Sequence, residues 1–340
     1  MFNLFACGEQ TYTYAVLNSK RWLITGGAGY IGSHIADQFL TSCQDVILYD
    51  DMRHGLKSRI DFLEEKHKRA IPLVIGDIRD VDSFINALNT YQPFGVIHSA
   101  ALKSVSKSMD SPDEYFEVNH LATKKLLECL DKVGVRNFIF SSTAAVYGSP
   151  DQTIPVDENY PPNPISPYGA SKLAAEEEVN EFRSIPGNHA TSLRFFNVVG
   201  TAAPELTDNS TENLVPIVIK SIKSGNPAVI YGTDYATPDG TCVRDYVDVR
   251  DVALAHLAVA NAESKLPVAL NVGTGHGVSV REAINLISII LGESNPKVFE
   301  ADRRLGDPAT LTAQVTLIEK TLGFKARYSF QESLESLNRV

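Results

Sequence analysis

A glycine-rich turn near the start of the chain constrains the fold more than any other feature. Gly26, Gly29 and Gly32 are spaced three residues apart, directly after an apolar run, Arg21–Thr25, and at the start of a helical pattern, Tyr30–Leu40. Glycine permits a tight turn and lets the backbone approach a pyrophosphate, which the amides at a helix N-terminus can bind. The sequence therefore predicts a strand, a phosphate-binding turn and a helix, in this order.

Short apolar runs alternate with helical stretches as far as Asn197. The runs are nearly continuously apolar, as expected for strands that are buried on both faces. Further runs cover residues 46–49, 71–75, 95–98, 138–141 and 191–195, and helical stretches cover 82–88, 115–133 and 171–182. We expect an α/β fold with a doubly wound parallel (Rossmann) sheet, joined by right-handed crossovers.

An acidic residue follows two of the predicted strands. Asp50 lies 18 residues after Gly32 and ends the second run, and Asp77 follows the third. A carboxylate at the end of the second strand can accept hydrogen bonds from both ribose hydroxyls, which favours NAD over NADP. Asp77 is placed to reach the adenine. NAD is therefore the expected cofactor.

A tyrosine and a lysine share one face of a predicted helix. Tyr168 and Lys172 are four residues apart, so their side chains leave the helix in the same direction. A phenol of ordinary pKa is a poor base at neutral pH, but a nearby ammonium and a positively charged nicotinamide would lower that pKa. Thr143 ends the fifth run, and its hydroxyl can bind the reacting oxygen beside Tyr168. The pattern predicts redox chemistry on an alcohol carbon.

Composition excludes several other functions. The chain has 340 residues, a net charge of −10 and no apolar run of the ~18 residues that cross a membrane, which argues against nucleic-acid and membrane binding. The four cysteines form no CxxC pair and lie at no metal-ligand spacing, so we expect free thiols in a reducing cytoplasm and no metal site. Residues 1–19 precede the first strand without the features of a secretory signal, and a disordered leader is expected.

The strand–helix alternation is looser after Asn197. Residues 201–213 and 231–242 read as long loops, which often carry binding function. A helix is predicted over Leu214–Lys223, with Pro216 tolerated near its start. The run Leu270–Gly275 is expected to return as a strand to the first sheet.

Several motifs resemble those of the extended short-chain dehydrogenase/reductase family. These motifs are Thr25–Gly32, Gly76–Arg79, Ser142–Gly148, Ser166–Lys172 and Arg194–Asn197. Three further stretches are more specific and resemble the UDP-glucose 4-epimerase family, namely His98–Lys103, Asp239–Tyr246 and Arg303–Asp307. The similarity runs from about Arg21 to the C-terminus. It implies an NAD-dependent interconversion of UDP-galactose and UDP-glucose, through a transient 4-keto sugar and internal return of the hydride.

The resemblance also implies a role for each residue that matches a family motif. Tyr168 would be the base, Lys172 its partner, and Thr143 the group that holds the sugar hydroxyl. The implied cofactor contacts are Gly26, Gly29, Tyr30, Ile31, Gly32, Asp50, Asp51, Asp77, Ile78, Ala100, Lys103, Tyr168 and Lys172. The implied substrate contacts are Lys103, Thr143, Tyr168, Phe196, Asn197, Asn213, Leu214, Arg244, Arg304, Asp307 and Thr310. Two arginines suit a diphosphate because arginine binds phosphate oxygens in a bidentate way.

The chain departs from the family pattern in two places that bear on the sugar. Thr143 stands where the family often has serine, and the hydroxyl is retained. The segment after Asp307 is one residue shorter than in some members, which puts Thr310 or Leu311 where a bulky aromatic can close off the sugar's 2-substituent. A smaller residue there leaves room for an N-acetyl group, so UDP-N-acetylhexosamines are further candidate substrates.

Three alternatives share the fold. A nucleotide-sugar 4,6-dehydratase usually has an Asp-Glu pair after the threonine of the fifth strand, where this chain has Ala144-Ala145. A simple dehydrogenase would release NADH at each turnover. A non-catalytic NAD sensor would more readily have lost Tyr168 or Lys172.

We expect two domains after the leader. Residues 20–197 form an NAD-binding Rossmann domain, and residues 198–340 form a smaller, mixed UDP-sugar-binding domain from which the chain crosses back near 243–275. The resemblance further implies a homodimer.

Overall fold

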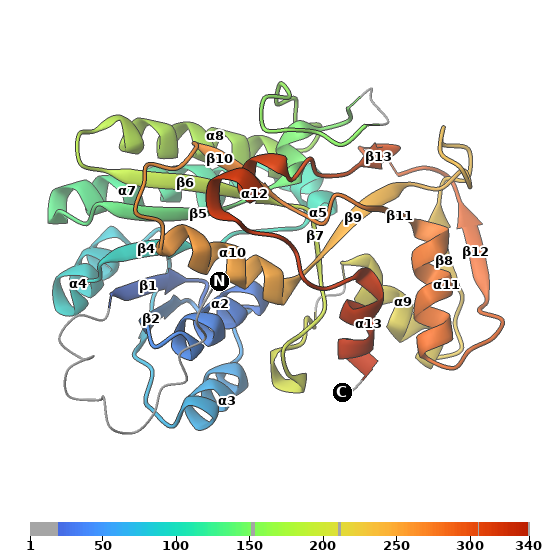
Figure 1. The fold of residues 1–340 in the computed structure, drawn as a ribbon, viewed down its shortest axis with the longest axis horizontal. Helices are drawn as coiled ribbons and strands as arrows, with labels where there is room; N and C mark the ends of the chain where they lie inside the picture. Colours follow the sequence, from blue (N-terminus) through green and yellow to red (C-terminus); the bar gives the residue numbers. More distant parts are fainter. Residues whose placement is uncertain (1–19, 151–153, 210–211, 305, 339–340) are drawn as a thin grey trace.

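A seven-stranded parallel sheet forms the centre of the molecule, and two smaller sheets lie at one end of it (Figure 1). The computed structural model describes residues 20–150, 154–209, 212–304 and 306–338. The expectation of a leader over 1–19, which includes Cys7, lies outside these residues. The predicted α/β class is confirmed.

The strands of the large sheet all pair in parallel, in the order β10-β6-β5-β4-β1-β2-β3. Their bounds are β1 (Arg21–Thr25), β2 (Asp45–Asp50), β3 (Leu73–Ile75), β4 (Gly95–His98), β5 (Asn137–Thr143), β6 (His189–Phe195) and β10 (Ala269–Val272). The third strand is shorter than the predicted run 71–75, because Pro72 has no amide hydrogen to donate. The carbonyl oxygen of Pro72 still accepts a hydrogen bond from Leu48.

Alternate residues of each strand are buried against different helices, which explains the continuous apolar runs. In β1, Trp22 and Ile24 face one hydrophobic core, which includes Phe39, while Leu23 faces a second core, which includes Phe138. Helices α2 and α10 pack together on the first face, and α4, α7 and α8 cover the second (Figure 1). The sheet is therefore the middle of three layers.

The helices have the following bounds: α2 (Tyr30–Thr41), α3 (Lys57–His67), α4 (Val81–Tyr91), α5 (Val105–Asp110), α6 (Pro112–Tyr115), α7 (Ala122–Val133), α8 (Pro167–Ser184), α9 (Leu214–Lys223), α10 (Val249–Ala260), α11 (Val280–Ile290), α12 (Thr316–Leu322) and α13 (Phe330–Asn338). A π-helical segment, η1 (Phe116–Leu121), lies between α6 and α7, and short 3₁₀ helices cover η2 (Ala144–Tyr147) and η3 (Pro204–Leu206). In the described residues, no helix is both long enough and apolar enough to cross a bilayer.

The smaller sheets gather strands from distant parts of the chain, and the one around β9 is mixed. β9 (Val243–Asp248) pairs in parallel with β7 (Asn197–Val199) and β13 (Thr310–Leu311), and antiparallel with β11 (Gly277–Ser279). β8 (Ala228–Tyr231) pairs with β12 (Val298–Ala301). The predicted strand in 270–275 returns to the large sheet as β10, whereas β9, at the start of the expected crossing, belongs to the smaller sheet.

Two predicted helices differ from those observed. The stretch 115–133 is divided by the π-helical segment, which the apolar period does not reveal. The stretch 171–182 belongs to a helix that starts earlier, at Pro167, because the Ser166 hydroxyl accepts from the Gly169 amide and caps it. Proline is favourable at a first helical position, and the longer helix includes Tyr168.

The carboxylate of Asp245 joins β9 to the segments that follow β10 and β13. It is fully buried and accepts hydrogen bonds from the Thr274 amide (2.9 Å) and hydroxyl (2.7 Å), the Gly275 amide (2.9 Å) and the Ala313 amide (3.2 Å). Four donors therefore depend on one side chain.

We expect Asp245→Ala to lower the free energy of unfolding by about 3 kcal/mol or more, because buried donors would lose their acceptor. Urea denaturation measures the change. Asp61→Ala removes an exposed carboxylate that pairs with Lys57, and should cost less than about 1 kcal/mol. Equal losses in the two variants would contradict the role of Asp245.

Candidate active site

The turn between β1 and α2 has space only for glycine at two of its positions. Gly26 has a φ of +68°, and its amide donates to the carbonyl oxygen of Tyr49 at 2.8 Å. A Cβ added at Gly32 would lie 2.1 Å from the Gly26 carbonyl oxygen. Helix α2 has Gly29 as its N-cap, and no side chain caps it. This leaves the N-terminal amides of α2 to an anionic ligand, as phosphate binding at a helix N-terminus requires.

Tyr30 and Ile31, which follow Gly29, contribute to the glycine turn through their backbone. The Tyr30 hydroxyl is directed away and donates to the Gly200 carbonyl oxygen at 2.6 Å, and Ile31 packs against the core under α2. Their predicted cofactor contacts can therefore come only from main-chain atoms.

The acidic residues after β2 and β3 meet at one edge of the sheet. The buried carboxylate of Asp50 accepts from the amides of Ala28 (3.0 Å) and Met52 (2.9 Å), which holds it against the turn. Arg53 lies 2.6 Å from the Asp51 carboxylate and 3.7 Å from that of Asp77. The structure thus brings the three predicted acidic residues together.

Asp77 is held mainly by Arg79, which follows it by two residues. The guanidinium donates to both carboxylate oxygens and lowers the pKa of Asp77 to about 2. Ile78 is buried beside it. Ala100 lies at the end of β4, where its amide donates to the Thr25 hydroxyl (3.3 Å), next to Gly26.

Tyr168, Thr143 and Lys172 meet above the carboxyl end of β5. The Tyr168 hydroxyl forms a hydrogen bond with the Thr143 side chain, and the edge of the Tyr115 ring packs against the Tyr168 ring with 6.4 Å between centroids. The Lys172 ammonium is almost completely buried and lies 4.1 Å from the centroid of the Phe140 ring. These three residues come from β5 and α8.

Burial shifts both titratable groups of this cluster against their charged forms. It raises the pKa of the Tyr168 phenol, which the hydrogen bond with Thr143 only partly offsets, and it lowers the pKa of Lys172 to about 7. The protein's own groups therefore do not make Tyr168 acidic, and the expected lowering of its pKa requires the positive charge of an oxidised nicotinamide.

Asn119 is a positioning residue that the sequence analysis missed. It lies in the π-helical segment, where its amide group accepts from the Leu102 amide (2.9 Å) and donates to the Leu102 carbonyl oxygen (2.9 Å) and the Ser171 hydroxyl (3.1 Å). Leu102 precedes Lys103, and Ser171 precedes Lys172. π-Helical segments are frequent at functional sites, but nothing in the local sequence distinguishes Asn119 from an ordinary helical residue.

Lys103 and Asn213 converge on a residue that no motif indicated. The Lys103 ammonium lies 3.6 Å from one carboxylate oxygen of Asp208, and the Asn213 amide donates to the other at 2.7 Å. Asp208 lies in the long loop predicted over 201–213. Leu214 follows directly as the first residue of α9.

A second group of predicted substrate residues surrounds β9. Arg244 lies 3.3 Å from the Asp307 carboxylate and donates to the Pro308 carbonyl oxygen at 2.7 Å. The Arg304 guanidinium stacks 3.7 Å from the centroid of the Tyr231 ring. Thr310 begins β13 and is partly buried. Tyr231 ends β8 and was not predicted as part of the site.

Phe196 and Asn197 lie where the large sheet gives way to the small one. Phe196 is buried in a small cluster with Tyr147 and Leu311. Asn197 is exposed and begins β7, beside Tyr246 of β9. The predicted residues thus form two groups, one around the turn and Tyr168, the other around β9.

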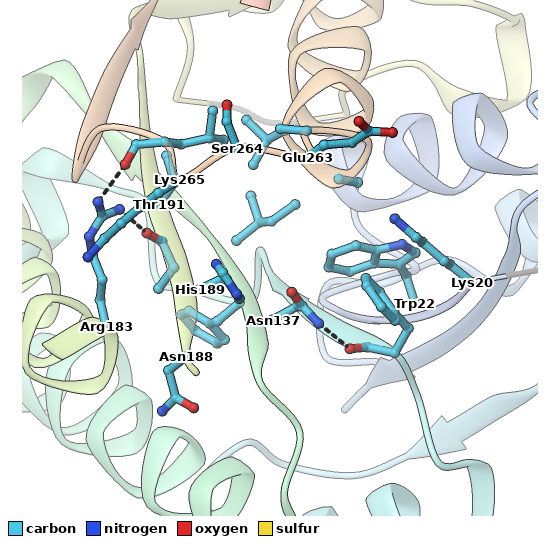
Figure 2. A pocket seen from close by; sticks show the side chains of 18 residues that line it. Lys20, Trp22, Asn137, Arg183, Asn188, His189, Thr191, Glu263, Ser264 and Lys265 are labelled. Atoms are coloured by element: carbon cyan, nitrogen blue, oxygen red, sulfur yellow. Dashed lines mark hydrogen bonds between the residues drawn. The ribbon is translucent and has the colours of Figure 1, made fainter. Parts of the chain in front are cut away.

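A separate cavity lies at the opposite edge of the large sheet (Figure 2). It has a volume of about 230 Å³ and is lined by residues at the amino ends of the strands, including Trp22 and Asn137. Arg183 donates to the carbonyl oxygens of Ala190 and Leu266, and Asn137 donates to that of Phe94. These side chains brace loops, and none of the predicted site residues lines the cavity.

Comparisons with known proteins place the chain in a family. Residues 23–337 match the family model described as GDP-mannose 4,6 dehydratase. The UDP-glucose 4-epimerase of Streptomyces lividans is 36% identical over 310 residues, which are 90% of this chain and 91% of that protein. The chain belongs to the UDP-glucose 4-epimerase family.

Solved structures show the same similarity. The UDP-glucose 4-epimerase of Bifidobacterium longum, in complex with NAD⁺ and UDP, has a TM-score of 0.88 and 34% identity, over 94% of this chain and 97% of that one. The UDP-Glc/GlcNAc 4-epimerase of Campylobacter jejuni has a TM-score of 0.81 and 34% identity, over 95% and 98%.

Among the described residues, those around the turn fit NAD. The uncapped N-terminus of α2 suits a pyrophosphate, and the Asp50 carboxylate lies at the end of the second strand, where ribose hydroxyls are bound in this fold. The glycine positions leave no room for a Cβ between the turn and the helix.

We expect Gly32→Ala to weaken NAD binding about tenfold or more, since overpacking of a close backbone contact costs about 1–3 kcal/mol. Isothermal titration of NAD-free protein measures the affinity. Gly134→Ala is the control, because it adds the same methyl group at a glycine where an added Cβ has no neighbour within 4 Å. Unchanged NAD affinity in Gly32→Ala would show that the turn does not bind the cofactor.

Proposed function

We propose that the protein is an NAD-dependent 4-epimerase that interconverts UDP-galactose and UDP-glucose. The observation that carries this function is the contact of Tyr168 with Thr143, beside buried Lys172, at the strand edge that also holds the glycine turn. The family membership of the whole chain supports the substrate class.

Three side chains perform the proton chemistry. The Thr143 hydroxyl holds the sugar 4-hydroxyl, Tyr168 takes its proton, and Lys172 stabilises the resulting negative charge and binds the nicotinamide ribose. Bound NAD would supply the hydride acceptor, and after reduction the hydride donor, for C4 of the sugar, whose oxidised form is a transient 4-keto sugar. Because the hydride would return to the opposite face of the same carbon, with the proton given back by Tyr168, the cycle involves no net oxidation.

The remaining predicted residues anchor cofactor and substrate. We assign the dinucleotide to residues 20–197 with the returning strand β10, and the UDP-sugar mainly to residues 198–340. Arg244 and Arg304 bind the diphosphate and Asp307 the uridine ribose, assisted by Lys103, Phe196, Asn197, Asn213 and Leu214. Strong binding of UDP with loose contacts to the sugar lets the 4-keto sugar turn over without leaving.

Each alternative differs from the epimerase in one feature of the site or of its turnover. A 4,6-dehydratase requires an acid and a base for loss of water, and Ala144 and Ala145 follow Thr143 in η2. A dehydrogenase would release NADH at each turnover, which the NMR experiment below would reveal. A non-catalytic sensor would not require the buried Lys172.

Three finer assignments complete the proposal. Thr310 is small, which leaves room for an N-acetyl group, and a relative of similar identity acts on UDP-Glc and UDP-GlcNAc. The family resemblance implies a homodimer, and Val105, Met109 and Leu121 are exposed apolar side chains that a partner subunit could cover. Cys129 and Cys242 are free thiols, which is consistent with a cytoplasmic protein.

Proton NMR of the purified protein with UDP-galactose and UDP-N-acetylgalactosamine in competition, without added NAD, tests the activity. We expect both sugars to be converted to their 4-epimers. Conversion of UDP-galactose alone would mean that the pocket near Thr310 is narrower than proposed. If neither sugar changes although the protein carries NAD, the 4-epimerase assignment is wrong.

We expect Tyr168→Phe to retain NAD and to lose about 10²–10⁴-fold in kcat, because positioned acid–base groups contribute this range. The bound cofactor is measured by absorbance after denaturation, and kcat with UDP-galactose. Tyr91→Phe, at the end of α4, is a control for loss of a phenol away from the site. Near-normal turnover of Tyr168→Phe would remove Tyr168 as the base.

A further inference from the structure

A buried ion pair lies directly beneath the proposed catalytic residues. Glu176 of α8 and Arg194 of β6 are 4% and 6% exposed. The guanidinium donates to both carboxylate oxygens, with Nε 3.0 and 3.1 Å from them and Nη2 2.6 Å from Oε2. Neither residue has a role in the proposed proton chemistry, although a buried charge pair is costly to form.

The pair joins the elements that carry the catalytic side chains. Ser142 and Arg194 are direct neighbours in the β5–β6 register, and the Ser142 hydroxyl donates to Glu176. Thr143 follows Ser142, and Lys172 precedes Glu176 by one helical turn. The carboxylate therefore ties α8 to the end of β5, between Lys172 and Thr143.

The network continues to the returning strand. Arg194 donates to the Tyr147 hydroxyl at 3.0 Å, which in turn donates to Asn271 of β10 at 2.7 Å. One connected set of buried hydrogen bonds thus links α8, β5, η2, β6 and β10. Such networks restrict their members to one arrangement when every group is satisfied.

We propose that the Glu176–Arg194 pair is a positioning element for the epimerase reaction, which fixes α8 over β5 and sets the electrostatic potential at the Lys172 ammonium. The proposal rests on the proposed function. Glu176 favours the charged form of Lys172, against the burial that lowers the pKa of this lysine to about 7. Arg194 balances the carboxylate, so the pair as a whole adds no net charge beneath Lys172.

Burial shifts the pKa values of the other titratable groups around Lys172 and the Glu176–Arg194 pair. On β4, burial and the charge of Lys172 lower the pKa of His98 to about 3. Burial raises the pKa of the Tyr115 phenol and raises that of Tyr147 to about 12. Burial also raises the pKa of Glu158, whose charge acts on Tyr147 and Arg194. Glu176 acts on Lys172, and both Glu176 and Arg194 act on Tyr147, so among the proposed catalytic residues Lys172 should respond most directly to a change of charge at the pair.

The test is the pH profile of kcat for UDP-galactose, measured for the holoenzyme and its variants. Glu176→Gln leaves the positive charge of Arg194 without its partner carboxylate. This charge disfavours the charged form of Lys172 and favours the Tyr168 phenolate, so the acidic and the basic limb of the pH profile should both move to lower pH by about one unit. Arg194→Met leaves the Glu176 carboxylate without its partner guanidinium, which favours the charged form of Lys172, so both limbs should move to higher pH. A purely structural role would not give shifts of opposite sign.

Three further variants complete the design. Glu176→Asp keeps the negative charge, so the limbs of its pH profile should stay at the wild-type pH values while kcat falls. The double variant Glu176→Gln/Arg194→Met should regain the wild-type limbs, with kcat reduced about tenfold and KM unchanged, because the tie between α8 and β5 is lost. Glu178→Gln makes the same charge change on α8, but Glu178 faces Lys124 and His120, so its profile should match wild type.

Shifts of the same sign in both single variants, or no shift in either, would overturn the proposal. If one single variant fails to fold by circular dichroism, the other decides by the direction of its shift. If both fail, a double variant with wild-type kcat overturns it. Wild-type protein that converts neither sugar would instead refute the proposed function, so the two failures are distinguishable.

Discussion

The parallel pairing of β1, β2, β4, β5 and β6 is the constraint on which the rest of the structure depends. The carboxyl ends of parallel strands meet at one edge of the sheet. Residues that are far apart in the sequence, such as Asp50 and Thr143, therefore lie at the same edge. The return of the chain as β10 joins this edge to the small sheet that carries Arg244. The cavity shown in Figure 2 lies at the other edge and takes no part in the proposed site.

Burial at this edge is both a cost and a functional requirement. It disfavours the charged forms of Tyr168 and Lys172, so placing these two side chains close together does not by itself favour their charged forms. The positive charge of an oxidised nicotinamide held nearby would favour the phenolate, which couples base strength to cofactor binding. The Glu176–Arg194 pair brings opposite charges beneath the same site without changing its net charge.

The two groups of site residues differ in how they are held. Tyr168, Thr143 and Lys172 are carried by a helix and a strand that share buried hydrogen bonds. Asp208 lies on a loop and Arg244 on the small sheet, where ion pairs hold them. The catalytic side chains are held rigidly on the large sheet and its helix, whereas the anchoring side chains lie on separate elements. This arrangement suits a reaction in which the sugar turns over while its UDP stays bound.

The sequence by itself determined the α/β class, most of the strands as far as β6, the glycine turn and the tyrosine–lysine pair, because period, spacing and glycine sterics are local properties. The tertiary structure alone decided the π-helical segment at Asn119, the contacts of Asp208 and the Glu176–Arg194 network. These depend on partners that can lie far away in the sequence, as Ser171 does from Asn119 and Lys103 from Asp208, and a buried glutamate in a helix has the same local pattern as an exposed one. The placement of β9 in the small sheet was likewise missed, because its sequence, with three charged residues among six, does not reveal which sheet it joins.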